Sequence, residues 1–481
     1  MRAKESELSK DVATASASGD GRGSDQERWH PARLIPTVGI RGQEEQEKRA
    51  TSSFLAVMSA VPEFGRAVLG DLHAPRGRVS TFAEIQLKDS SGKLSIPDGA
   101  VVVQRGKTTW RCLVEVKTGA AELKAEQVSR YLDMARDHRF DAVLTISNQI
   151  TSSAQDSPIT IDRRRTRSVG LYHLSWWRII TEAIVQHRHK GVSDPDQAWI
   201  LGELIAYLDN ERSGASGFQD MGDKWVKVRN AVTNGTLRAA DPEVREVAER
   251  WDQFVEYLCL GLGQDLGRDV RPVWPRKSTR DARLDGHVKS LAENGKLDAS
   301  IRVPDAVGFV SVEADLRARR ISTSVVVDAP REGRPLTRVN WLLKQLRQAP
   351  PDLRLDVGFA NARETTSLLL AEVRVYPQRL LSEGEPKREP RVFRLTLASA
   401  MGTKRGKDEG SFVRDTRQQA VDFYRDLVQD LRARQPPAPK LPEDPIEVQE
   451  TPQSSPPPFS ADALREAGNA AEVKATDERP S

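Results

Sequence analysis

The sequence predicts an α/β protein with a second α+β domain and disordered termini. The chain has 481 residues, which is enough for two or three domains. In its first half, stretches with the 3.6-residue period of amphipathic helices alternate with short apolar runs typical of strands. Both ends are polar and rich in Ser, Gly or Pro, a composition that cannot bury a core.

These shifts in composition suggest the boundaries of the folded parts. We expect a disordered segment over residues 1–36 and an acidic, Pro-rich disordered tail over 435–481. Between them we expect a first domain over 37–211, a Ser/Gly-containing linker over 212–222, and a second domain over 223–434. The second domain begins with a helical pattern and continues as α+β, and the sequence does not indicate its role.

In the first domain, the expected order of elements is helix, three strands, helix, strand. Phe54, Leu55, Met58 and Val61 recur at helical spacing, and Pro62 is expected to end this first helix. The elements that follow are strands over 79–87, 94–103 and 110–117, a helix over 120–138, and strands over 141–148 and 169–176. Helices over 176–188 and 195–210 complete the domain, and Asp194 is expected to cap the second of these.

In the second domain, a helical pattern runs over 223–262. The strands expected after it form an antiparallel meander over 296–303, 309–316 and 321–328. A helix over 339–349, strands over 353–360 and 392–399, and a helix over 418–433 follow.

Composition excludes some classes of protein. The N-terminus lacks the apolar run of a signal peptide, and the chain has no stretch of about 18 apolar residues, so we expect a cytoplasmic protein without membrane contact. Cys112 and Cys259 both lie in apolar runs and are expected to be buried thiols. Residues 436–481 carry four Lys/Arg and nine Asp/Glu, so the rest of the chain is more basic than the net charge of +4 suggests. That balance is compatible with a polyanionic partner but does not require one.

One stretch of the first domain, SIPDGAVVVQRGKTTWRCLVEVKTG, carries the residues from which we predict chemistry. Glu115 and Lys117 are two residues apart in a predicted strand and should share a face, with Val116 on the opposite side. Asp98 lies in or beside the neighbouring strand, close enough to share a cation with Glu115. Two carboxylates with a backbone carbonyl, here that of Val116, are ligands that Mg²⁺ or Mn²⁺ accepts. Lys117 could then orient an attacking water and offset negative charge in the transition state.

This pattern resembles the PD-(D/E)xK nuclease superfamily, through Pro97-Asp98 and Glu115-Val116-Lys117. The expected order of elements is also that of this family's restriction-endonuclease-like core, a mixed central sheet flanked by helices. Gln127 and Tyr131 in the following helix resemble the Q-x(3)-Y motif of its RecB-like branch. The resemblance covers about residues 40–180 and implies a catalytic set of Asp98, Glu115, Lys117, Gln127 and Tyr131.

The same resemblance implies a further metal-binding acid from the first helix. Glu44, Glu45 and Glu47 are the candidates, and we slightly favour Glu45. The implied metal ligands are then Asp98, Glu115, the Val116 carbonyl and Glu45.

Other residues could contact a nucleic acid. Arg163, Arg164, Arg165 and Arg167 form a basic run in a predicted loop and could bind phosphates, although such runs are often only solvated. Trp176 and Trp177 could stack on bases, but packing within a helix is the favoured interpretation.

The functional prediction is a Mg²⁺- or Mn²⁺-dependent phosphodiesterase that cleaves DNA, in a role such as defence or repair. The alternative is an inactive nuclease-fold protein that binds nucleic acid or acts as a protein scaffold. An RNA-processing enzyme would use the same chemistry on another substrate. A homodimer, or a protein partner bound through the second domain or the tail, is compatible with each of these. In the structural alternative, Asp98-Gly99 is a simple turn and Glu115 and Lys117 form a solvated pair on an edge strand.

Overall fold

The computed structural model describes residues 33–433, apart from 90–91, 152, 216, 276–277, 382–387, 405 and 407. The expected disordered segments 1–36 and 435–481 lie outside the described residues, except for positions 33–36. There, Arg33 and Leu34 contact the carboxylate of Glu203 at 3.0 and 2.9 Å. The described residues belong to one compact unit that ends at Ala433.

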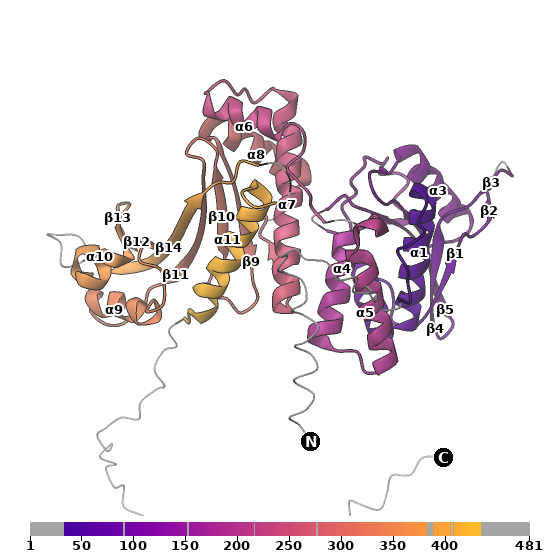
Figure 1. Cartoon of the computed structure of the whole chain (residues 1–481), viewed down its shortest axis with the longest axis horizontal. Coiled ribbons are helices and arrows are strands. Elements are labelled where there is room, and N and C mark those ends of the chain that lie inside the picture. The colour runs from indigo at the N-terminus through magenta and orange to yellow at the C-terminus, as the bar shows by residue number, and fades with distance from the viewer. Residues whose placement is uncertain are drawn as a thin grey trace, which may run out of the picture. The chain divides into compact units, whose positions relative to one another are not determined.

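The expected α/β class is confirmed by a mixed five-stranded sheet flanked by helices (Figure 1). Its strands, in spatial order, are β1 (Arg78–Ala83), β4 (Gly99–Arg105), β5 (Thr108–Val116), β6 (Ala142–Ser147) and β7 (Gly170–Ser175). β4 is antiparallel to both of its neighbours, β1 and β5, whereas β5, β6 and β7 run parallel. The carboxyl ends of β5, β6 and β7 therefore meet at one edge of the sheet.

Helices cover both faces of this sheet. One core joins its first face to α1 (Gly42–Ala60), α2 (Pro62–Asp71), α4 (Trp176–Val185) and α5 (Pro195–Asp209). A smaller core joins the second face to α3 (Ala125–Asp137). The alternation of strand side chains explains both cores, because Val114 and Val116 belong to the first and Leu113 to the second.

The structure differs from the sequence-based expectation around two elements. Helix α1 ends at Ala60, just before Pro62 as expected, but Pro62 is also the first residue of α2, where a missing N–H costs nothing. The strand expected over 79–87 ends at Ala83 because Glu84 has a left-handed backbone with φ 52°. The residues beyond it form a separate two-stranded ribbon of β2 (Leu87–Lys88) and β3 (Leu94–Ser95).

Two other expectations are confirmed. The Asp194 side chain accepts hydrogen bonds from the N–H groups of Asp196 and Gln197 and caps α5. Cys112 and Cys259 are both buried free thiols.

The second half of the described chain contains an antiparallel sheet with the order β13-β12-β14-β11-β10-β9-β8. The expected meander is confirmed as β9, β10 and β11, which pair in sequence order. The strands are β8 (Arg271–Pro272), β9 (Lys296–Arg302), β10 (Val310–Asp315), β11 (Arg320–Asp328), β12 (Arg354–Phe359), β13 (Thr365–Leu369) and β14 (Pro390–Ala400).

Six α-helices accompany this sheet in the part of the chain that is described. They are α6 (Trp225–Thr233), α7 (Pro242–Leu266), α8 (Arg280–Asn294), α9 (Pro335–Gln345), α10 (Leu370–Val375) and α11 (Phe412–Asp426). The last helix begins six residues before the expected start at Gln418, because Ser411 caps it by accepting the Arg414 N–H. The short helical turns are η1 (Gln186–Lys190), η2 (Glu211–Ser213), η3 (Pro377–Leu381) and η4 (Val428–Asp430).

The expected linker over 212–222 is packed against the rest of the protein. Phe218 and Met221 are 5% and 2% exposed, and the Phe218 ring lies 5.4 Å from that of Phe254 on α7. Among the described residues, no helix combines the length and the apolar character needed to cross a membrane.

Candidate functional site

Asp98 and Glu115 meet at one end of the first sheet. Asp98 directly precedes β4, and Glu115 is the penultimate residue of the neighbouring strand β5. Gly99 pairs with Val114 across these strands. Asp98 Oδ2 accepts a hydrogen bond from the Val116 backbone N–H at 2.7 Å. The structure thus brings the two acids together as the spacing predicts.

Gly99 allows this strand to start in close contact with α1. A Cβ atom at this position would lie 2.5 Å from Leu55 Cδ1 and 2.8 Å from the Phe82 carbonyl oxygen. From Gly99 onward the chain pairs with β1 on one side and β5 on the other. The alternative that Asp98-Gly99 is a simple turn is therefore wrong.

Glu115 is buried in an interior strand of the sheet. β5 lies between β4 and β6, and Glu115 is 1% exposed. Its Oε1 accepts a hydrogen bond from Gln127 Nε2 at 2.6 Å and lies 2.8 Å from Lys117 Nζ. The alternative of a solvated ion pair on an edge strand is also wrong.

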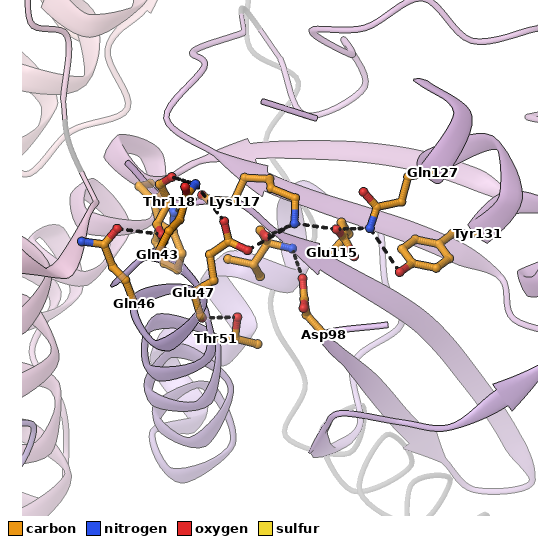
Figure 2. Close-up of polar contacts among 12 residues, drawn as sticks. Gln43, Gln46, Glu47, Thr51, Asp98, Glu115, Lys117, Thr118, Gln127 and Tyr131 are labelled. Carbon is orange, nitrogen blue, oxygen red and sulfur yellow. Dashed lines mark hydrogen bonds and ion pairs between the residues drawn. The ribbon is translucent and has the colours of Figure 1, made fainter. Parts of the chain in front are cut away.

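Lys117 connects the acids of the sheet to the first helix (Figure 2). Its Nζ lies 2.8 Å from Glu115 Oε1, 3.0 Å from the Val116 carbonyl oxygen and 3.3 Å from Glu47 Oε2. Trp176 donates its indole N–H to the Lys117 carbonyl at 2.9 Å. The ammonium group is therefore surrounded by oxygen atoms, and its backbone is fixed from α4.

The surroundings of these groups change their pKa values. Burial and the charge of Asp98 raise the pKa of Glu115 to about 7, although Lys117 acts in the opposite direction. Burial also raises the pKa of Asp98, against the Val116 hydrogen bond and the charge of Lys117. Burial lowers the pKa of Lys117, but the nearby carboxylates outweigh this effect and its net direction is upward. Near neutral pH, Lys117 is therefore charged, whereas Glu115 is present in both its protonated and its ionised form.

Gln127 and Tyr131 of α3 lie beside Glu115, as their helical spacing predicts. Gln127 Nε2 donates to both Glu115 Oε1 and the Tyr131 hydroxyl, the latter at 3.3 Å. Burial raises the pKa of Tyr131, and the charge of Glu115 adds to this effect. Gln127 thus holds one oxygen of the Glu115 carboxylate, and Tyr131 accepts a hydrogen bond from Gln127.

The acid that α1 contributes to this cluster is Glu47, whereas Glu45 lies elsewhere. The Glu45 carboxylate accepts the Arg41 backbone N–H at 2.8 Å and pairs with Arg49 at 2.6 Å. Sequence contained a signal for Glu47, because it lies four residues before Thr51 and seven before Phe54. Both of those residues are buried, so Glu47 shares the face of α1 that packs on the sheet.

Sequence reasoning also missed the polar side chains that fix the segment after Lys117. Thr118 donates its hydroxyl to Gln46 Oε1 at 3.0 Å, and Gln43 Nε2 donates to the Thr118 carbonyl at 3.3 Å. Both glutamines belong to α1. The sequence does not reveal this role, because polar side chains at the exposed start of a helix could equally well hydrogen-bond to water.

The arginine run lies in the connection between β6 and β7, and one of its four side chains contacts the protein itself. Arg165 donates to the Ser129 carbonyl at 3.3 Å and forms an ion pair with Asp133, so it fastens the loop to α3. Arg163, Arg164 and Arg167 are exposed. Trp176, by contrast, is fully buried and packs at 6.1 Å from the Phe54 ring, which confirms packing over base stacking.

The oxygen atoms of this cluster match the ligand type of a divalent cation. The carboxylates of Asp98, Glu115 and Glu47 and the Val116 carbonyl are the hard oxygen donors that Mg²⁺ and Mn²⁺ prefer. Three of them already surround the ammonium cation of Lys117. Within the described ranges, however, no group of three or more His, Cys, Asp or Glu side chains has the arrangement of a preformed metal site. Lys117 would have to move for these oxygens to converge on a metal ion.

Comparison with known proteins adds no assignment to this geometry. No protein-family model matches the chain, and no curated protein matches it significantly.

Proposed function

We propose that this chain is a nuclease that hydrolyses phosphodiester bonds with the help of a bound Mg²⁺ or Mn²⁺ ion. The observation that carries the proposal is the contact of Lys117 with Glu115, beside Asp98, at the end of a buried strand. The strand order β1-β4-β5-β6-β7, with its change from antiparallel to parallel pairing at β5, supports a restriction-endonuclease-like core.

The ligands proposed for the ion are the carboxylates of Asp98 and Glu115 and the Val116 carbonyl, with Glu47 in place of Glu45. Bound there, the ion would polarise the scissile phosphate and lower the pKa of a coordinated water. Asp98 is already oriented by the Val116 N–H, and Glu115 by Gln127. Such prior orientation reduces the reorganisation needed when the substrate binds.

Lys117 has two proposed roles. Before the substrate binds, its charge offsets the repulsion between Glu115 and Glu47, with which it forms ion pairs. During hydrolysis, the ammonium group holds the attacking water and stabilises negative charge on the phosphate oxygens. The buried Trp176, which holds the Lys117 carbonyl, is a positioning residue for this group.

We propose DNA as the substrate. Arg163, Arg164 and Arg167 are exposed in the loop after β6 and could bind a polyanion. Arg165 attaches this loop to α3, the helix that also carries Gln127 and Tyr131, so the loop lies near the proposed site. Charge alone would bind either nucleic acid. The experiment must therefore distinguish cleavage of DNA from cleavage of RNA and from binding without cleavage.

The test is a cleavage assay with supercoiled plasmid, linear duplex, single-stranded DNA and RNA in Mg²⁺, Mn²⁺ or EDTA. Lys117→Ala is expected to lower the rate by at least about 100-fold, the cost of losing a preorganised charge. Lys296→Ala is a matched control, because Lys296 is also a strand lysine in an ion pair, with Glu313 at 2.9 Å. Equal cleavage by Lys117→Ala would refute the assignment. A folded wild type that cuts nothing but binds DNA in EDTA would favour the scaffold.

A further inference from the structure

A cavity of about 400 Å³ lies apart from the Lys117 cluster, within the compact unit. Its walls come from the end of α2, the segment after β6, the end of β7, the start of α4, the middle of α7, and β8 with the residues after it. This volume is within the range of small-molecule sites in proteins, which start at about 300 Å³.

The cavity has a buried acid without a partner. Glu256 of α7 is 7% exposed and lines the cavity, and its Oε2 has no hydrogen-bond partner among the described residues. A buried polar atom loses its hydrogen bonds to water and is costly to leave unpaired, so such atoms usually have a bound partner. Trp274 lines the same cavity, and its indole N–H is also buried without a partner in the described part of the chain.

The protonation state of Glu256 decides what it can bind. Burial raises the pKa of Glu256 to about 8, although Arg178 and Arg271 act against this effect. At neutral pH the group is therefore mainly a carboxylic acid, with one O–H donor and one carbonyl acceptor. This donor–acceptor pair is complementary to the amide or amidine edge of a nucleobase, which presents an N–H beside an acceptor.

Two guanidinium groups line the same cavity. Arg178 is held by both oxygens of Asp71, at 3.1 and 3.2 Å, so it is a fixed part of the wall. Arg271 pairs only with Asp269, at 2.7 Å in the described structure, and its side chain is 66% exposed. It can therefore turn toward a phosphate, which arginine binds through paired N–H donors.

From these groups we infer that the cavity binds a single nucleotide, with the base at Glu256 and Trp274 and the phosphate at Arg271. The cavity would hold the nucleotide in contact with α7 and β8 as well as with α2 and α4. This inference does not depend on cleavage by the Lys117 cluster, and it assigns a second site to the chain.

Calorimetric titration of the full chain with AMP, GMP, CMP and UMP in EDTA tests the inference. We expect at least one nucleotide to bind, and its nucleoside to bind about tenfold more weakly for want of the phosphate. Glu256→Leu should weaken nucleotide binding at least about tenfold, whereas Glu256→Gln, which keeps a donor and an acceptor, should bind like the wild type. Because Glu256 Oε2 makes no hydrogen bond in the structure, neither variant should impair folding.

Arginine variants test the position of the phosphate. Arg271→Ala should reduce nucleotide binding to the level of the nucleoside. Arg354→Ala is its matched control, because Arg354 is likewise a strand arginine paired with an aspartate two residues away, Asp356, at 2.9 Å. Absence of binding by every nucleotide, or binding that Glu256→Leu leaves intact, would overturn the inference. Since no metal or cleavage is involved, this result is independent of the nuclease test.

Discussion

Replacing Glu115 by Gln should remove a pH-dependent loss of stability from the metal-free protein. Burial and the charge of Asp98 raise the pKa of Glu115 from 4.5 to about 7, and its side chain is 2% exposed. Between these two pH values the folded protein binds a proton at this group and the unfolded chain does not. The free energy of unfolding therefore falls as pH rises from 4.5 through 7. A rise of this pKa from 4.5 to about 7 corresponds to a total loss of about 3 kcal/mol in the free energy of unfolding across the full pH range.

Urea unfolding at pH 5 and pH 8 in EDTA, followed by circular dichroism, measures this difference. The wild type should lose about 2–3 kcal/mol more between these pH values than Glu115→Gln, because the amide cannot ionise. Glu256 also has a raised pKa, but it is present in both proteins and cancels in the comparison. Glu313→Gln is the control, since Glu313 pairs with Lys296 on a strand and its side chain is 40% exposed. The same pH dependence in Glu115→Gln and the wild type would refute the reasoning.

Further predictions concern packing, positioning and the proposed metal ion. Gly99→Ala should destabilise the protein by about 1–3 kcal/mol, because the new methyl group would lie 2.5 Å from Leu55 Cδ1. An unchanged thermal midpoint would contradict this close packing. Gln127→Leu should lower kcat about tenfold or more, since Glu115 loses a hydrogen bond of 2.6 Å. Trp176→Phe should likewise lower kcat with little change in KM, because it frees the Lys117 carbonyl. If KM alone changed in either variant, the positioning role would be wrong. Mn²⁺ affinity, measured by calorimetry, should rise from pH 6 to pH 8 as Glu115 loses its proton, and a flat profile would argue against Glu115 as a ligand.

The strands around the candidate site could be predicted because their signals are local. Apolar runs and the i, i+2 rule predict that Glu115 and Lys117 lie together and that Val116 faces the other way; in the structure Lys117, directly after β5, contacts Glu115, and Val116 lies in the first core. The helical spacing of Gln127 and Tyr131 also gave their common position beside Glu115.

The choice among the acids of α1 depended on tertiary packing. Glu44, Glu45 and Glu47 lie within one turn, and which of them faces the sheet is fixed by how the whole helix packs. The buried residues Thr51 and Phe54 set that phase and select Glu47. Extending the apolar pattern backward by one turn would have identified it.

Other features had weak or ambiguous sequence signals. Pro62 is compatible with either the end of one helix or the start of the next, and only the chain after it decides. Helix α8 buries Leu284 and Leu291 among mostly polar residues, so its apolar period is faint. Cavities lined by segments distant in sequence, such as that of Glu256, have no local signal at all.

The most direct test of the central proposal is plasmid cleavage by Asp98→Asn in Mg²⁺. Asparagine keeps the size of the side chain and an oxygen for the Val116 N–H, but it removes the charge that the proposed ion requires. Asp356→Asn is the control, because Asp356 is likewise a partly buried aspartate, but it lies on β12 and pairs with Arg354. We predict metal-dependent cleavage by the wild type and by Asp356→Asn, and a rate at least about 100-fold lower for Asp98→Asn. Cleavage by Asp98→Asn at the wild-type rate would contradict the proposal.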